Sequence, residues 1–226
     1  MGRIHITFEG KELTQSKFDE IEKKVLEYFQ NLWNEIQESV RRIRKEDHQH
    51  LKSELCLAFI GADSLARFAE IITTGEEGSG PGKSERRFRN WIDSYVLTDG
   101  NETYKEWKRH INCDSQILWK IRCSLLHFYG IPLLDKEHIV FSSDHKLVEK
   151  LNVAIAGRPD NRRARAIDPY RLINALRDGF LTQLETFRDL LLGTDESKKE
   201  VYLRGTVKVY EIIKYEGTVF VPIKKK

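Results

Sequence analysis

The sequence predicts a mainly α-helical bundle with a small β appendage. Long segments with apolar residues at steps of three and four predict helices over most of the chain. Short alternating segments at 3–8, 138–156 and 201–223 predict peripheral strands. The chain of 226 residues carries no internal repeat or low-complexity tract. We therefore expect one domain over residues 1–226, with its helical body at 16–192.

The helices of the body are predicted in chain order from their start and stop signals. Ser16 is the expected N-cap of a first helix of seven to eight turns, and its apolar stripe recurs every three or four residues. Further helices are expected over 50–72 and 86–96, and from about residue 101 to a break at 112–115. Asp114 then caps a segment that ends at Gly130, and the Asp168–Pro169 pair starts a helix that stops at Gly193.

The predicted strands come from alternation between polar and apolar residues. The "RIHITF" segment near the N-terminus alternates in this way, and residues 138–143 and 151–156 are also expected to be strands, with a helical turn at 144–150 between them. The basic segment 157–168 is expected to be a loop. Residues 201–223 alternate in two arms around "YEG", which predicts a C-terminal hairpin.

Composition limits the class of protein. The chain is 40% hydrophobic and 32% charged, with a formal net charge of +3, which is typical of a soluble globular protein. No run of ~18 apolar residues predicts a membrane span, and the N-terminus lacks the apolar segment of a signal peptide. The three cysteines, Cys56, Cys113 and Cys123, form no CxxC pair; Cys56 and Cys123 are expected to be buried free thiols, which indicates a cytoplasmic protein.

Several common site types are disfavoured. The string "GSGPGKS" at 78–84 resembles a phosphate-binding loop, but the first glycine of that motif would fall at Glu77, and the preceding segment is predicted to be helix. His48 and His50 are two positions apart, and no HxxxH or HExxH occurs, so no metal site is expected. No G-x-S-x-G nucleophile motif is present. We expect neither a metal nor a cofactor.

Two polar residues stand in the apolar segment "LWKIRCSLLHFYG", residues 118–130. Arg122 and His127 are five positions apart, so on a helix they differ by about 140° in direction and ~7.5 Å in rise. The helix is apolar on two sides, and a second copy of the chain could cover one of them, which predicts a homodimer. A purely structural alternative is that Arg122 pairs with a carboxylate such as Asp63 and His127 stabilises the helix C-terminus.

The string "IRCSLLH" resembles the R-x(4–6)-H signature of HEPN domains. The upstream segment "FIGADSLARFAEI" at 59–71, "FRNWIDSYV" in the intervening helix and "DPYRLINAL" after the signature are similar to the helices of bacterial HEPN-like proteins. The resemblance covers about residues 16–192. It implies a helical bundle that dimerises.

The resemblance also implies an activity. HEPN nucleases cut RNA without a metal by attack of the 2′-hydroxyl on the adjacent phosphate. Arg122 would then stabilise the transition state, His127 would move the proton, and Asp63 would orient one of them. Active members often have a polar residue directly after the arginine, where this chain has Cys123.

Clustered arginines provide candidate RNA contacts. The segment 157–168 carries Arg158, Arg162, Arg163 and Arg165, and Arg171 follows it; the segment 83–89 has four further basic residues. A solvated basic surface is the structural alternative. Phe88, Trp91 and Tyr95 follow at helical steps and are expected to be core residues.

Two functions follow as expectations. The first is a metal-independent endoribonuclease in bacterial defence or a toxin–antitoxin pair, with RNA, a second copy and an antitoxin or other protein as partners. The second is a non-catalytic HEPN scaffold that binds a nucleotide, RNA or a protein. A third interpretation, a structural helical dimer without a ligand, predicts that Arg122 is buried in a salt bridge and His127 is inaccessible.

Overall fold

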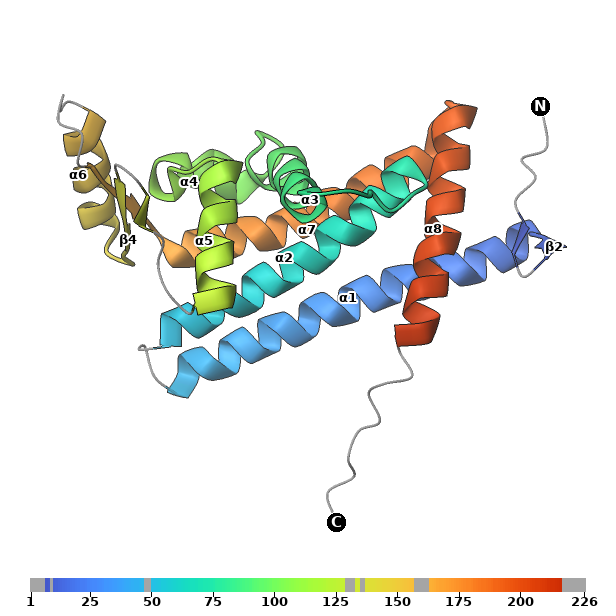
Figure 1. Ribbon diagram of the computed structural model, residues 1–226, viewed down its shortest axis with the longest axis horizontal. Coiled ribbons are helices and arrows are strands. Elements are labelled where there is room, and N and C mark those ends of the chain that lie inside the picture. The colour runs from blue at the N-terminus through green and yellow to red at the C-terminus, as the bar shows by residue number, and fades with distance from the viewer. Residues whose placement is uncertain are drawn as a thin grey trace, which may run out of the picture.

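The computed structural model describes residues 7–8, 10–46, 50–128, 133–134, 137–156 and 163–216. Within these ranges the chain is mainly helical, as predicted, with a small β component. Three long helices form the body: α1 (Gln15–Glu46), α2 (Leu51–Thr74) and α7 (Pro169–Leu192). Figure 1 shows these three helices running along the long axis of the molecule, with α8 (Glu196–Glu216) crossing them near one end.

Shorter helices cover the body on one side. They are α3 (Lys83–Trp91), the π-helical turn η2 (Ile92–Val96), α4 (Glu102–Ile111) and α5 (Ser115–Phe128). The predicted break before α5 is confirmed, because Asn112 adopts a left-handed conformation and Asp114 accepts a hydrogen bond from the Ile117 backbone. Ser115 donates to Asp93 of η2 at 2.9 Å, which fixes the start of α5.

The core is centred on α2, which packs against α1, α3, α5, α7 and α8. Its buried residues lie on several sides of the helix, as expected of a helix surrounded by others. The predicted stripe of α1 is confirmed, with Trp33 buried more completely than its neighbour Leu32. Phe88, Trp91 and Tyr95 are buried core residues, as predicted.

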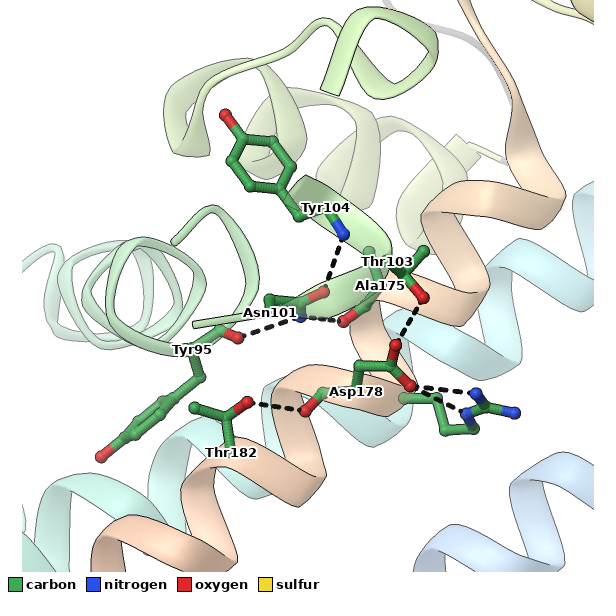
Figure 2. Close-up of polar contacts among 8 residues, drawn as sticks. Tyr95, Asn101, Thr103, Tyr104, Ala175, Asp178 and Thr182 are labelled. Carbon is green, nitrogen blue, oxygen red and sulfur yellow. Dashed lines mark hydrogen bonds and ion pairs between the residues drawn. The ribbon is translucent and has the colours of Figure 1, made fainter. Parts of the chain in front are cut away.

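A buried asparagine joins α4 to the body (Figure 2). Asn101 is fully buried, and its side-chain amide donates to the carbonyl oxygens of Tyr95 and Ala175 at 3.1 and 2.8 Å. Its side-chain oxygen accepts from the Tyr104 backbone at 2.9 Å, so it also caps α4. Thr103 donates to Asp178 of α7 next to this contact. One side chain therefore connects η2, α4 and α7.

The β component is a three-stranded sheet and a two-residue pair. Strands β3 (Leu133–Leu134) and β4 (Glu137–Phe141) are antiparallel, and β4 pairs in parallel with β5 (Arg163–Ile167). The β4–β5 register runs from Glu137 opposite Arg163 to Phe141 opposite Ile167. Strands β1 (Thr7–Phe8) and β2 (Lys11–Glu12) form the pair near the N-terminus. The strand expected at 3–8 is thus described only at Thr7–Phe8.

One strand prediction and one loop prediction at 138–168 need correction. Residues 151–156 belong to α6 (His145–Ala156), which connects β4 to β5. Asp144 caps α6 by accepting from the backbone of Lys146 and Leu147, and Val148 is buried, so a helical face begins well before residue 151. The expected loop at 157–168 contains β5, because its apolar positions Ala166 and Ile167 are buried beside β4.

The predicted C-terminal hairpin is also wrong where the structure describes it. Residues 196–216 form α8, and residues 217–223 lie outside the described ranges. Asp195 caps α8 by accepting from the backbone of Ser197 and Lys198. One face of α8 is buried at steps of three and four residues, at Tyr202, Thr206, Val209 and Ile213. The helical body therefore extends past residue 192.

Gly205 makes the close approach of α8 to α2 possible. A Cβ atom at this position would overlap the Ile71 carbonyl oxygen and the Ile72 backbone. The alternating β-branched residues of this segment favour a strand locally. Burial against α1 and α2 decides the conformation instead.

Candidate functional site around Arg122

The Arg122 side chain lies between α5 and α2, where it pairs with Asp63. Its Nη2 is 2.9 Å from Oδ2 of Asp63, and the two side chains are 13% and 25% exposed. The pair therefore sits at the edge of the core rather than in open solvent. The structure brings together two of the three predicted catalytic residues.

Arg122 is also held by its own helix. Its guanidinium carbon lies 4.8 Å from the centre of the Trp119 ring, a cation–π distance, and Nη1 lies 3.9 Å from the Cys123 sulfur. Trp119 in turn packs against Phe88 of α3. Cys123, the residue that departs from the HEPN pattern, thus contacts the guanidinium directly.

The ion pair leaves hydrogen-bonding capacity unused. Oδ1 of Asp63 and Nε of Arg122 are buried and have no hydrogen-bond partner among the described residues. Buried polar atoms of this kind are uncommon in folded proteins. A ligand or a water at this edge could satisfy them.

His127 lies in the last turn of α5 and is exposed. Its place on the helix is five residues beyond Arg122, so the two side chains leave α5 in different directions. An exposed His127 contradicts one half of the structural interpretation, which expects it to be inaccessible. The other half, a salt bridge to Arg122, is observed.

The two apolar sides of α5 are covered unequally. Ile117, Ile121 and Leu125 are buried on the first side, as expected. On the second side Leu118 is fully buried within the chain, and Cys123 is half-buried. The chain itself therefore covers residues on both apolar sides of α5.

Of the arginines predicted to bind RNA in the segment 157–168, two lie within the described residues. Arg158 and Arg162 lie outside the described residues, and Arg163 is a residue of β5. The Arg165 side chain donates to the Asn112 carbonyl at 2.7 Å. Arg165 thus holds the turn between α4 and α5, a structural role that the sequence did not indicate.

In the loop at 78–84 that resembles a phosphate-binding loop, the nearby basic side chains form ion pairs with Glu77. Glu77 lies 3.0 Å from Arg67, 3.6 Å from Arg87 and 3.9 Å from Lys83. Burial acts to raise the pKa of Glu77, but the hydrogen bond from Arg67 and the three positive charges lower it overall. The segment before the loop is helix α2, as predicted. A carboxylate therefore occupies the place where a phosphate would need positive charge.

The three cysteines are free thiols, and all are half-buried rather than fully buried. Desolvation raises the pKa of the Cys56 and Cys113 thiols. Raised values disfavour the reactive thiolate. Cys56 points its sulfur at the Leu125 carbonyl, 3.7 Å away, which places it in the contact between α2 and α5.

Two grooves run along α1, each of about 570 Å³. One lies between α1, α2 and α7 and includes Trp33, Arg41 and Arg177 in its lining; the other lies between α1, α7 and α8. Neither is lined by Asp63, Arg122 or His127.

Within the described part of the chain, no group of three His, Cys, Asp or Glu residues has a metal-binding arrangement. No helix described is long and apolar enough to cross a membrane.

One polar cluster was not predicted as a group. His110 and Trp107 of α4, His145 of α6, and Asp168 and Arg171 at the start of α7 lie together. Asp168 was predicted only as a helix cap. The histidines are far apart in sequence, and α6, expected only as a helical turn at 144–150, brings His145 to the end of α4.

The fold and the Arg122 site define a mainly α-helical protein with a half-buried Arg–Asp pair and an exposed histidine on one helix. Comparisons of the chain with protein-family models, with curated proteins and with solved structures found no match.

Proposed function

We propose that this protein is a HEPN-like, metal-independent endoribonuclease that acts as a homodimer. The observation that carries the proposal is the Asp63–Arg122 pair between α2 and α5, with His127 exposed at the end of the same helix. The resemblance of "IRCSLLH" to the HEPN signature supplies the reaction. Bacterial defence or a toxin–antitoxin pair is the setting that the resemblance implies.

Arg122 would contact the scissile phosphate. A guanidinium stays charged throughout the reaction and can bind two phosphate oxygens at once. One Nη group is engaged by Asp63, and Nη1 faces only the weak acceptor sulfur of Cys123. Nη1 is therefore the donor that a phosphate could recruit with the least rearrangement.

Asp63 would act as a positioning residue. Its carboxylate holds the guanidinium in one orientation at the edge of the core. Substrate binding then loses little side-chain entropy of Arg122, because the guanidinium is already ordered. Asp63 also neutralises part of the positive charge of Arg122. Removing Asp63 would therefore leave more charge for the phosphate but would no longer fix the orientation of the guanidinium.

His127 would transfer the proton. The 2′-oxygen attacks the phosphorus, the bond to the 5′-oxygen breaks, and a 2′,3′-cyclic phosphate remains on one product. The proton leaves the 2′-hydroxyl to a histidine and reaches the 5′-oxygen from a histidine. The two copies of His127 in a dimer can divide these roles. Dimerisation also suits a helix whose Arg122 and His127 point in different directions.

The test is cleavage of a labelled single-stranded RNA in EDTA by the purified chain. Wild type is expected to produce fragments with cyclic phosphate ends, whereas Arg122→Gln and His127→Ala lower the rate by about 10²-fold or more. Asp63→Asn lowers it less. His50→Ala, which removes another exposed histidine, serves as the control and retains the wild-type rate.

The alternative is a non-catalytic HEPN scaffold that binds a nucleotide, RNA or a protein partner. It is favoured by one observation, the low exposure of Arg122 beside its carboxylate. RNA binding without cleavage would select this alternative. RNA that stays intact and unbound, or cleavage that Arg122→Gln and His127→Ala leave unchanged, would overturn the nuclease proposal.

A further inference from the structure

A polar cluster away from the Arg122 site joins α4, α6 and α7. We call it the His145 cluster. It comprises Trp107, His110, His145, Asp168 and Arg171. It shares no residue with the Asp63–Arg122 pair.

Asp168 is the buried anchor of the cluster. Its Oδ1 caps α7 by accepting from the backbone of Tyr170 and Arg171 at 2.9 and 3.1 Å. Its Oδ2 lies 2.7 Å from Nδ1 of His145. That contact is short but not aligned as a hydrogen bond, and Oδ2 has no hydrogen-bond partner within the described ranges. The imidazole is thus the group that faces a fully buried carboxylate oxygen.

His145 connects this anchor to the surface. Its side chain is 45% exposed, whereas Asp168 is completely buried. Nδ1 is the ring nitrogen next to the carboxylate, so Nε2 is the nitrogen left for a ligand. A histidine held in this way presents one fixed nitrogen to a ligand.

Arg171 adds a permanent positive charge. Its guanidinium carbon lies 3.6 Å from the centre of the Trp107 ring, so the two groups stack. No hydrogen bond or ion pair engages the guanidinium within the part of the chain that the structure describes. Stacking uses the face of the guanidinium and leaves its N–H groups at the edge, which is the arrangement that binds phosphate oxygens in pairs.

His110 completes the cluster. Its ring centre lies 5.6 Å from that of His145 and 5.0 Å from that of Trp107. Two imidazoles and one guanidinium therefore surround the same indole. A guanidinium this close disfavours a metal cation between the histidines, because like charges repel.

The scaffold holds these groups in place. The Asp168 backbone donates to the His110 carbonyl at 2.8 Å, and the Asn152 amide donates to the carbonyls of Arg109 and Ala166, both at 2.9 Å. These bonds lock α4, α6 and β5 together. The N-termini of α6 and α7 both lie at the cluster, and their helix dipoles add positive potential.

Charges of both signs surround the cluster. Lys108, Arg109 and Lys146 are exposed on the helices that form it, and so are Glu106 and Glu149. Of the other carboxylates, Asp168 faces His145, and Asp144 caps α6. The cation that distinguishes the cluster is therefore the Arg171 guanidinium stacked on Trp107.

We propose that the His145 cluster is a binding site for a phosphate group, with Arg171, His145 and His110 as donors and Asp168 as the residue that positions His145. The group that the site recognises is a pair of phosphate oxygens. They can belong to a free phosphate or to the backbone of an oligonucleotide. The proposal goes beyond the nuclease proposal and does not depend on it.

The test follows the ring resonances of His110 and His145 by NMR while a ligand is added to the full chain. One arm uses inorganic phosphate and the other a short single-stranded oligoribonucleotide. Both histidine signals are expected to shift and saturate, whereas the exposed His50 at the N-cap of α2 gives an unshifted reference. The arm that saturates at the lower concentration identifies the source of the phosphate.

Variants separate binding from folding. Arg171→Gln and His145→Gln are expected to weaken binding about tenfold, the effect of one charge-assisted hydrogen bond. Arg177→Gln, on the same helix but paired with Asp178, is the matched control and binds like wild type. Arg122→Gln also binds like wild type, which distinguishes this site from the nuclease proposal. Absence of shifts in both arms, or equal affinity of Arg171→Gln and Arg177→Gln, would overturn the proposal.

Discussion

At the scale of single residues, the Asp63–Arg122 pair both joins two helices and forms the candidate site. It lies where solvent screening is reduced, with Arg122 13% exposed. Breaking such a pair leaves one charge without its partner, which costs more than the pair itself contributes.

We therefore expect Asp63→Ala and Arg122→Ala each to lower the free energy of unfolding by about 1–3 kcal/mol. The double variant should lose less than the sum of the two, because the second substitution removes the stranded charge. Urea unfolding of the four proteins measures this coupling. Strictly additive losses would mean that the two side chains do not interact in solution.

Glu77 provides a pH-dependent test at the same scale. Its pKa is lowered because the Arg67 hydrogen bond and the nearby positive charges outweigh the effect of burial. A lowered pKa in the folded state contributes stability above the ordinary value of about 4.3, and the contribution disappears as the pH falls through the lowered value.

Wild type is thus expected to be about 1 kcal/mol more stable than Glu77→Gln at pH 7. The difference should shrink as the pH is lowered from about 5 to 3, as urea unfolding at several pH values would measure. Glu85→Gln, which alters a more exposed pair with Arg89, is the control. A difference that is the same at pH 7 and pH 3 would contradict the assignment.

Part of the site could be predicted from the sequence at this scale. Asp63 and Arg122 are 59 positions apart, yet the pair was anticipated, because a charged residue in an apolar helix needs a partner. The His145 cluster could not be anticipated in this way. Its members are polar residues at helix ends, where a histidine or an aspartate is ordinary, and only tertiary packing brings them together.

At the scale of elements, most of the predicted helix caps are confirmed, but Ser16 lies inside α1, where Thr14 accepts from the Lys17 backbone instead. Asp114, Asp168 and Gly193 mark helix ends as predicted. Alternation was the least reliable, since 151–156 and 201–216 alternate in sequence but are helical. In both segments an aspartate caps the helix before the apolar residues, at Asp144 and Asp195, and such a cap favours a helix over a strand.

Gly205 gives a test of element packing. We expect Gly205→Ala to lower the free energy of unfolding by about 1–3 kcal/mol, because the new Cβ would push α8 away from the α2 backbone. Gly100→Ala is the control, since a Cβ there meets only ordinary van der Waals contact. Thermal or urea unfolding of both variants makes the comparison. Alanine raises helix propensity, so unchanged stability of Gly205→Ala would show that α8 can move away at no cost.

At the scale of the whole molecule, the elements differ in how many neighbours support them. Helix α2 packs against five other helices, whereas α6 packs against α4 and β5 and leaves Leu147 and Val153 exposed. Opening α6 therefore exposes much less buried apolar surface than opening α2. The His145 cluster stands on this less supported end of the molecule, as Figure 1 indicates by the position of α6.

Native-state hydrogen exchange is expected to follow this difference. Amides in the middle of α2, around Leu65, should exchange only through global unfolding, whereas those of α6 should exchange faster by local opening. If the phosphate proposal holds, saturating phosphate slows exchange in α6 and leaves α2 unchanged. Equal protection of the two helices without ligand would contradict the expected order.

The position of α8 in the chain has a consequence for synthesis on the ribosome. The faces of α1 and α2 that α8 covers, including Ile71 and Ile72, are made more than a hundred residues before α8 itself. Until residues 196–216 emerge, these apolar faces have no native partner. The nascent chain therefore carries an exposed hydrophobic surface for several seconds at ordinary translation rates, a surface that chaperones recognise.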